Sequence, residues 1–332
     1  MFHFKAIIHI FGMLMLLNGL FMATILPVSY YNDSGDFTAI LASSVILSNL
    51  GLLIWWLTRK VKKELSRRDG YIVVGLGWIL MGLTGALPFV LSGAIPSIPS
   101  AIFETFSGYT TTGASILDNI EALPEGIILW RSMTQWIGGM GIIVLTVAIL
   151  PLFGVGGLEL FMAESPGPSS GKIHPKITDT AKRLWILYVL LTFVEAILLR
   201  IAGMSWLDAV NHSFTTMSTG GFSTKNASIA AYNSPAIEYI VTAFMLVGGV
   251  NFSMIYFILK GAFKKVIGNE EFKTYIGIVL LFTGVITASL FSMNGELEKS
   301  FRESAFQVVT IITTTGFSTS NYALWSPFAY ML

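Results

Sequence analysis

Seven apolar stretches of the chain are long enough to cross a lipid bilayer as helices. A hydrocarbon core about 30 Å thick requires roughly 20 residues of helix, and polar or basic loops separate the stretches. They are Ala6–Tyr30, Phe37–Leu57, Tyr71–Leu91, Gly126–Leu150, Leu184–Leu199, Ala236–Leu259 and Tyr275–Met293. This pattern predicts an all-α integral membrane protein.

Three further apolar segments are too short to cross. Ala101–Gly113, Ala209–Gly221 and Ser304–Gly316 have about 13 residues each, where a spanning helix needs about 20. Each is a predicted short helix that ends in hydroxyl-bearing residues and a glycine, and the three overlay without a gap when their final glycines are aligned. A segment that enters the membrane without crossing it must return to the same side. We therefore predict repeated units of helix, re-entrant pore loop and helix.

These repeats divide the chain into four predicted parts. An N-terminal extension of two helices without a re-entrant loop occupies residues 1–69. Pore repeats follow at 70–160, 161–265 and 266–332.

The distribution of basic residues predicts the orientation. Fifteen of the 20 Lys and Arg residues are Lys5 or lie in three short regions, 59–68, 172–183 and 260–273. By the positive-inside rule these regions and the N-terminus are cytoplasmic. The charges stay on one side only if all three short segments enter from the outer side, so the charge count and the re-entrant prediction support each other.

Composition excludes several classes of protein. Hydrophobic residues make up 54% of the chain and charged residues 12%, against roughly 25% charged in soluble domains. The absence of cysteine excludes a disulfide framework, a cysteine zinc site and a thiol nucleophile. No HExxH, P-loop or GxSxG motif occurs, so we expect no enzyme activity. The basic residues lie in short loops, so we expect no nucleic-acid binding.

The end of each short segment has the composition of a cation filter, and we call these stretches the first, second and third filter runs. A ring of backbone carbonyls can replace the water shell of a potassium ion, and glycine permits a positive φ or a close approach of backbone to ion. A single Thr-Thr-Thr-Gly is a common loop sequence, so the prediction depends on its recurrence. The predicted filter residues are Thr110, Thr111, Thr112 and Gly113, then Ser218, Thr219, Gly220 and Gly221, then Thr313, Thr314, Thr315 and Gly316.

Other polar or glycine-rich positions allow two interpretations each. Glu104, His212 and Gln307 share one aligned position, where support of the short helix is favoured over a direct role at the outer vestibule. Glu195 lies inside a span and is either a functional carboxylate or an interfacial one. The glycine pairs in Gly138–Gly141 and Gly248–Asn251 favour helix packing over gating.

Several longer stretches resemble the TrkH/TrkG family of bacterial potassium-uptake membrane subunits, in the Trk/Ktr/HKT superfamily. The resemblance covers essentially the whole chain, and the two additional N-terminal spans favour this branch over the shorter KtrB branch. The stretches are RRDGYIVV (Arg67–Val74), SGYTTTGAS (Ser107–Ser115), RSMTQWIGGMGIIVLTVAILP (Arg131–Pro151), STGGFST (Ser218–Thr224) and TTTGFST (Thr313–Thr319).

The resemblance implies a pore of four repeats around one axis, with one filter glycine from each repeat. It also implies a bacterial inner-membrane location, a homodimer, and a cytosolic ring of nucleotide-binding TrkA subunits, which the basic loops at Lys172–Lys176 and Lys260–Lys265 would meet. The transported ion would be K⁺, with no organic cofactor. This chain stops at Leu332, 16 residues after Gly316, before the third inner helix and the fourth repeat. We therefore expect the 332 residues to be a fragment truncated at the C-terminus.

The sequence thus predicts potassium uptake through a pore lined by carbonyls of the filter runs. Two alternatives stay open. One is a potassium symporter coupled to protons or sodium, with Glu195 as the titratable group. The other is a non-conducting membrane scaffold or regulatory subunit.

Overall fold

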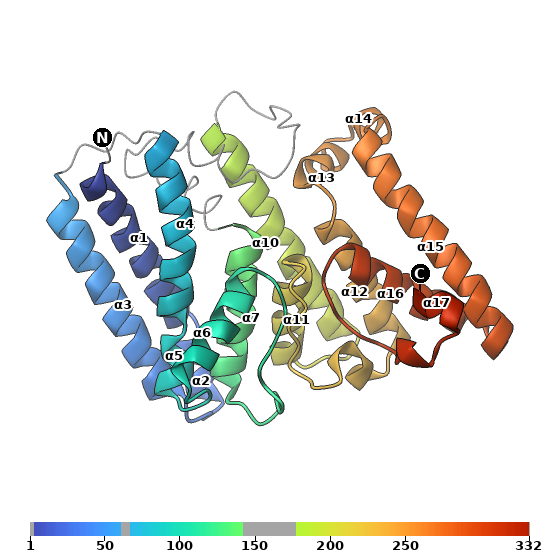
Figure 1. Ribbon diagram of the computed structural model, residues 1–332, viewed down its shortest axis with the longest axis horizontal. Helices are drawn as coiled ribbons and strands as arrows, with labels where there is room; N and C mark the ends of the chain where they lie inside the picture. Colours follow the sequence, from blue (N-terminus) through green and yellow to red (C-terminus); the bar gives the residue numbers. More distant parts are fainter. Residues whose placement is uncertain (1–2, 61–66, 142–176, 332) are drawn as a thin grey trace. The chain divides into compact units, whose positions relative to one another are not determined.

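The helices expected from the hydrophobic pattern are present. The computed structural model describes residues 3–60, 67–141 and 177–331, and within these ranges every regular element is a helix (Figure 1). Five stretches are long and apolar enough to span a membrane: Phe4–Tyr31, Phe37–Thr58, Arg68–Leu91, Lys182–Ile201 and Glu270–Asn294. The predicted class, an all-α integral membrane protein, is confirmed.

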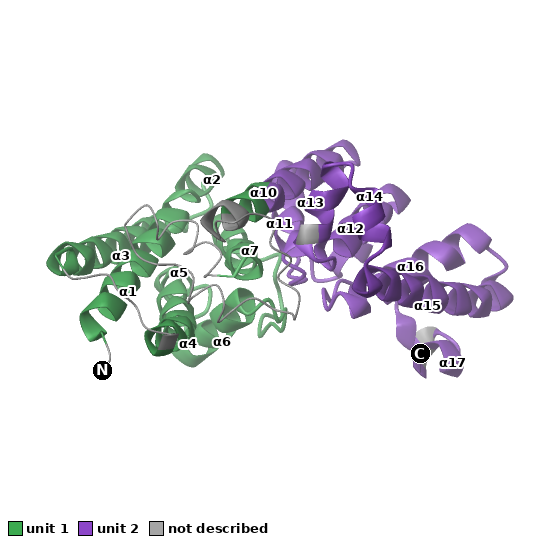
Figure 2. Ribbon diagram, turned by 90° about the horizontal axis from the view of Figure 1, so that it is seen from above, with its two compact units in different colours: residues 1–186 green, residues 187–332 purple. Residues whose placement is uncertain are grey.

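The chain forms two compact units, residues 1–186 and 187–332, and each is described by itself (Figure 2). The first unit contains α1 (Phe4–Ala23), α2 (Leu26–Tyr31), α3 (Phe37–Thr58), α4 (Arg67–Gly85), α5 (Leu87–Leu91), α6 (Ile98–Tyr109) and α7 (Glu125–Gly139). In this unit α1 packs against α3 and α4, and the short helix α6 packs against α4 and α7.

A buried chain of hydrogen bonds fixes the end of α6 in the first unit. The Tyr109 hydroxyl donates to Asn18 Oδ1 at 2.7 Å, and Asn18 Nδ2 donates to Thr84 Oγ1 at 3.0 Å. Asn18 lies on α1 and Thr84 on α4, so the last residue of the short helix is tied to two spanning helices.

The second unit also combines long apolar helices with short ones. After α10 (Ile177–Ile201), which begins in the first unit, come α11 (Trp206–Met217), the 3-10 helix η2 (Ser228–Tyr232), α12 (Pro235–Gly248), α13 (Phe252–Leu259), α14 (Phe263–Ile267), α15 (Glu270–Asn294), α16 (Leu297–Ile312), η3 (Tyr322–Leu324) and α17 (Pro327–Met331). Apolar side chains from α12, α15 and α16 form its core, among them Val241, Met245, Ile286, Phe306 and Val309. This core holds the short helix α16 against the longer helices.

Two predicted spans are each divided by a short break that precedes a proline. The first span is α1 followed by α2, with a break at Thr24 and Ile25 before Pro27. The third is α4 followed by α5, with a break at Ala86 before Pro88. Proline has no N–H to donate to the preceding turn, and it is tolerated where a new helix starts.

The predicted span Ala236–Leu259, in which the glycine pair was expected to allow close packing, is not one continuous helix. The chain forms α12 and α13 instead, separated by Gly249–Asn251. A side chain at Gly249 would have its Cβ only 2.7 Å from Thr313 Cγ2, in the third filter run. The glycine pair therefore permits close packing against the filter runs, and the helix ends where this contact is made.

The predicted span Gly126–Leu150 is only partly described. Helix α7 ends at Gly139, and Gly141 follows with a φ of +70°. Residues 142–150 and the basic segment Lys172–Lys176 lie outside the described residues.

Candidate functional site

Each filter run begins where a short helix ends, and all three have the same backbone. The second residue of every run has a left-handed conformation, and so has the final glycine. The φ angles are 52° at Thr111, 52° at Thr219 and 58° at Thr314, and 77°, 75° and 82° at Gly113, Gly221 and Gly316. Positive φ was expected for glycine. For threonine it is an outlier, because a β-branched residue clashes with its own backbone at an expense of about 1–2 kcal/mol.

Backbone hydrogen bonds explain how this conformation is held. In the first run the amide of Thr110 donates to Phe106 O at 2.8 Å, that of Thr111 to Gly108 O at 2.9 Å and that of Thr112 to Ser107 O at 2.9 Å. The same three spacings recur in the other runs, at 3.3, 2.9 and 2.9 Å from Ser218 and at 2.9, 3.0 and 2.9 Å from Thr313. This is a Schellman helix end with threonine in the place where glycine is usual.

The carbonyl groups of the first and third runs have no such partners among the described residues. Within the described part of the chain, no hydrogen-bond donor reaches a carbonyl of Thr110–Gly113 or of Thr313–Gly316. The amides donate back into the short helix, whereas the oxygens do not accept. The first and third runs therefore offer lone pairs only, which suits a cation and not an anion.

Side-chain hydroxyls brace the runs from within. Thr110 Oγ1 donates to Phe106 O at 2.7 Å and lies 2.8 Å from Thr112 Oγ1. The third run repeats both contacts, with 2.7 Å between Thr313 Oγ1 and Val309 O and 2.8 Å between the hydroxyls of Thr313 and Thr315. In the second run glycine replaces the last threonine, and the Ser218 hydroxyl donates to Thr215 O at 3.2 Å. The hydroxyls thus stabilise the loop.

Glu104 joins three elements of the first repeat. Its buried carboxylate accepts from Arg131 Nε of α7 at 2.7 Å, from the Ser115 hydroxyl at 2.9 Å and from the amide of Ile116 at 3.0 Å. Ser115 and Ile116 follow the filter glycine. Glu104 therefore fixes the outgoing part of the loop to the short helix.

His212 makes the corresponding contact in the second repeat. Its Nε2 lies 3.0 Å from the Ser223 hydroxyl, and its Nδ1 lies 2.8 Å from the carbonyl of Asp208. Ser223 stands two residues after its glycine, as Ser115 does. In the third repeat the equivalent Gln307 Oε1 is buried and has no hydrogen-bond partner among the described residues. The alignment of the three segments already showed the serine that Glu104 and His212 contact, but its role was missed.

The start of α11 is fixed by a serine and an aspartate. The amide of Asp208 donates to the Ser205 hydroxyl at 3.0 Å, and Thr224 Oγ1, from beyond the filter run, donates to Asp208 Oδ1 at 2.5 Å. Burial opposes ionisation of Asp208, but the hydrogen bonds from Thr224 and Ser205 outweigh it and hold the pKa of this carboxyl below its usual value. Ser205, which precedes α11, and Thr224, which follows the second filter run, are thereby both bonded to Asp208 in the first turn of α11.

The structure brings the second and third filter runs together in the second unit. A Cβ added to Gly221 would lie 1.8 Å from the carbonyl oxygen of Thr315, so the two backbones touch. The first run lies in the other unit, where Gly138 of α7 approaches Tyr109, the residue before the run. A Cβ at Gly138 would lie 2.0 Å from the Tyr109 oxygen.

Glu195 lies on α10 and is completely buried. The Thr216 side chain lies near enough to interact with the carboxylate, but neither carboxylate oxygen makes a hydrogen bond of good geometry among the described residues. The position is therefore in the protein interior and not in an exposed part of the helix. No group of three His, Asp or Glu residues that could hold a metal ion occurs in the described ranges.

Comparisons with known proteins agree with this architecture. Residues 37–332 match a family model described as "TrkH: Cation transport protein". The Trk system potassium uptake protein TrkH of Escherichia coli K12 is 42% identical over 99% of this chain and 69% of its own length. The protein of the same name from Halomonas elongata is 39% identical over 97% of this chain and 67% of its own. The crystal structure of the potassium transporter TrkH from Vibrio parahaemolyticus superposes with a TM-score of 0.84 at 35% identity, over 98% of this chain and 68% of that one.

Proposed function

The chain belongs to the TrkH family of cation transport proteins, and from that premise we propose that it takes part in potassium uptake across the bacterial cytoplasmic membrane. The ion passes the three filter runs, whose backbone carbonyls replace its water shell. The names of the relatives support potassium as the ion. The geometry of the runs supports their role.

One observation carries this proposal. In the first and third runs the amides donate back into the short helix, while the described structure gives the carbonyls no donor. A desolvated cation needs oxygen ligands that no N–H already occupies. The short helices also end at the runs, so the negative ends of their dipoles lie beside the ion. Glu104 and His212 act here as supports of the loops and not as ligands, whereas Gln307 Oε1 has no such contact among the described residues.

The remaining parts of the proposal concern architecture and assembly. Residues 1–69 form the N-terminal extension, and 70–160, 161–265 and 266–332 are successive pore repeats. A homodimer docks on cytosolic nucleotide-binding subunits of the TrkA type through basic loops that include Lys260–Lys265. Charge reversal at the exposed Lys264 and Lys265 weakens that docking, and unchanged regulation in these variants would count against it.

A coupled symporter is the second candidate function, and the buried carboxyl of Glu195 favours it. A titrating carboxyl that couples proton movement to potassium cannot be replaced by an amide. Glu195→Gln would therefore abolish proton-coupled uptake, whereas a pore that uses only backbone carbonyls keeps its uptake. Potassium uptake by the Glu195→Gln variant, measured with and without a proton gradient, distinguishes the coupled symporter from the pore.

The test of the filter is a glycine substitution in a bacterial strain that lacks its own potassium uptake. Gly113→Ser places a side chain at a φ of 77°, and Gly316→Ser does so at 82°. Each is expected to lower discrimination between potassium and sodium by about 10-fold, which corresponds to about 1.4 kcal/mol. Gly35→Ser is the matched control, because Gly35 has a φ of 78° and lies outside the filter runs.

Growth at low potassium and uptake of rubidium in competition with sodium measure the effect. Unchanged selectivity in both filter variants would contradict the proposed role of the runs. A wild-type chain that reaches the membrane and carries no potassium would instead support a scaffold or regulatory role.

A further inference from the structure

The loop that follows the third filter run is held by a segment of the preceding repeat. The amide of Ser318 donates to the Ser228 hydroxyl at 3.2 Å, and the carbonyl of Ser318 accepts from the amide of Ala230 at 3.1 Å. Ser228 and Ala230 belong to η2, which lies between the second filter run and α12. Both backbone groups of Ser318 are therefore fixed by η2.

In the other two loops the corresponding serine is bonded to its own repeat. The serine two residues after the glycine bonds to the short helix of its own repeat, Ser115 to Glu104 and Ser223 to His212. The described structure records no bond between Ser318 and Gln307, and Gln307 Oε1 has no partner there. The third loop lacks the brace that its own helix would supply.

Ser228 adopts an unfavourable conformation to make this contact. Its φ is +55°, in the left-handed region that side chains other than glycine, asparagine and aspartate seldom occupy. Such strain persists only where surrounding contacts impose it. The contacts here include the bond to Ser318 and a bond from the Ser228 amide to Lys225 O at 3.0 Å.

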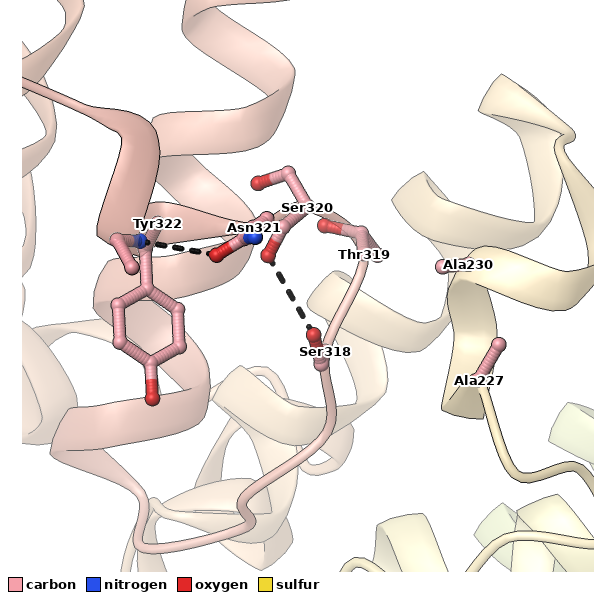
Figure 3. Close-up of a pocket in the computed structure, with 8 residues that line it drawn as sticks. Ala227, Ala230, Ser318, Thr319, Ser320, Asn321 and Tyr322 are labelled. Atoms are coloured by element: carbon pink, nitrogen blue, oxygen red, sulfur yellow. Dashed lines mark hydrogen bonds between the residues drawn. The ribbon is translucent and has the colours of Figure 1, made fainter.

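Few side chains pack on one side of the contact between Ser228 and Ser318. An open hollow of ≈ 530 Å³ lies between Ala227 and Ala230 on one wall and residues 318–323 on the other (Figure 3). Phe317 is buried in the core of the unit, with its ring 5.9 Å from that of His212 between centroids, and Thr315 O lies against Gly221. The segment from Ser318 onward lines the hollow, and its backbone is held there by the hydrogen bonds to η2.

We propose that Ser228 is a positioning residue that sets the ion selectivity of the third filter run from the second repeat, without contacting the ion. The inference rests on the proposed function of the runs. Without the Ser228 hydroxyl, the amide of Ser318 loses its acceptor and only the bond from Ala230 remains, so the segment after Gly316 shifts and the carbonyls of the third run shift with it.

The decisive variant is Ser228→Gly in the full chain. Glycine adopts the same φ without strain and removes only the hydroxyl. Loss of one hydrogen bond predicts a decrease in discrimination between potassium and sodium of about 2- to 10-fold. The matched control is Asn233→Gly, because Asn233 ends η2 with a φ of +43° and has an exposed side chain. Asn233→Gly is expected to leave selectivity unchanged.

A rescue variant separates positioning from a general loss of structure. Ser228→Asn tolerates the left-handed conformation and offers a side-chain carbonyl as acceptor, so it is expected to restore selectivity. If Ser228→Gly does not reach the membrane, Ser228→Ala, which also lacks the acceptor, is measured in its place. The effect is expected on the selectivity ratio, with the amount of protein and its melting temperature close to wild type.

The outcomes distinguish this inference from the proposal on which it rests. If Gly316→Ser lowers selectivity and the variant without the Ser228 hydroxyl does not, the role of Ser228 is overturned and the filter stands. If neither variant changes selectivity, the proposed filter itself is wrong. If Ser228→Asn fails to restore what Ser228→Gly loses, the hydroxyl is not acting as the acceptor for Ser318.

Discussion

Gly221 and Gly316 share a left-handed backbone but have different surroundings. A Cβ at Gly221 would overlap the carbonyl oxygen of Thr315 at 1.8 Å, whereas a Cβ at Gly316 meets no atom within 4 Å. Gly316→Ala therefore introduces backbone strain of about 1–2 kcal/mol, and Gly221→Ala must displace the third run as well. We predict that Gly221→Ala lowers both potassium uptake and melting temperature more than Gly316→Ala does. Thermal unfolding in detergent measures the melting temperature, and uptake assays measure potassium transport. Equal effects of the two substitutions would contradict the contact between the second and third runs.

At the scale of single residues, the sequence predicted the positive φ of the three glycines that end the runs. It did not predict the left-handed conformation of the threonines. Glycine has a low barrier to positive φ, so its position at the end of each run was informative. Threonine at Thr111, Thr219 and Thr314 favours extended backbone, and its left-handed conformation follows from hydrogen bonds to the preceding helix. The backbone preference of threonine cannot reveal a conformation that hydrogen bonds to neighbouring groups impose.

The ion pair between Glu104 and Arg131 links two elements of the first repeat and yields a prediction at that scale. Both side chains are at least 98% buried, since 2% or less of each is exposed. Arg131→Leu leaves the carboxylate buried without its cation and is expected to destabilise the protein by about 3–5 kcal/mol. The double variant Glu104→Gln, Arg131→Leu removes both charges and is expected to recover part of that loss. Melting temperatures in detergent test the pair, and a double variant less stable than Arg131→Leu would contradict this account.

Arg302 joins α12 to α16 and permits a comparison of two carboxylates. Its Nη1 donates to Glu238 Oε2 at 2.6 Å, and its Nε donates to Glu298 Oε1 at 2.9 Å. Glu238 is 8% exposed and Glu298 is 61% exposed. Because water screens the second pair, we predict a loss of about 1.5–3 kcal/mol for Glu238→Gln and a much smaller loss for Glu298→Gln. A lower melting temperature for Glu238→Gln than for Glu298→Gln would support this prediction, and the reverse order would contradict it.

The helices themselves were largely predictable, and their interruptions were not. The apolar pattern located α3 and α15 to within a few residues, because lipid-facing and core-facing positions are both apolar in a spanning helix. The break at Gly249–Asn251 was not predicted as a helix end, since glycine pairs also occur inside packed membrane helices. What ends α12 is its contact with the filter runs, which are distant in sequence.

Orientation in the membrane belongs to the whole molecule, and the lack of cysteine makes it directly testable. Lys264 and Asp118 are both exposed, and the charge distribution predicts that they lie on opposite sides of the membrane. A membrane-impermeant thiol reagent applied to intact spheroplasts is expected to label Asp118→Cys and not Lys264→Cys. Permeabilised cells provide the control, because both variants should then react. Labelling of Lys264→Cys from outside would reverse the predicted orientation.

Part of the candidate site could be derived from the sequence at this scale. Alignment of the three short segments identified matching positions, including Glu104 and His212, because one backbone pattern is repeated. It gave no indication that η2 holds the third loop through Ser228, since that contact joins residues 90 positions apart. Contacts between repeats depend on how the units pack, and a repeated motif does not encode them.

In the first and third filter runs the backbone amides donate hydrogen bonds and the carbonyls accept none among the described residues. This asymmetry links ion binding to local unfolding of the loop. The amides stay bonded to the helix only while the loop is closed. If the carbonyls bind an ion as proposed, they do so only in that state. An ion that binds the closed loop alone stabilises it by RT ln(1 + [ion]/Kd), about 2.7 kcal/mol at 100 times Kd. Hydrogen exchange of the amides at Thr111 and Thr314 therefore slows in potassium relative to sodium by up to about 100-fold. On the proposed function, the transported ion would stabilise the folded loops that bind it.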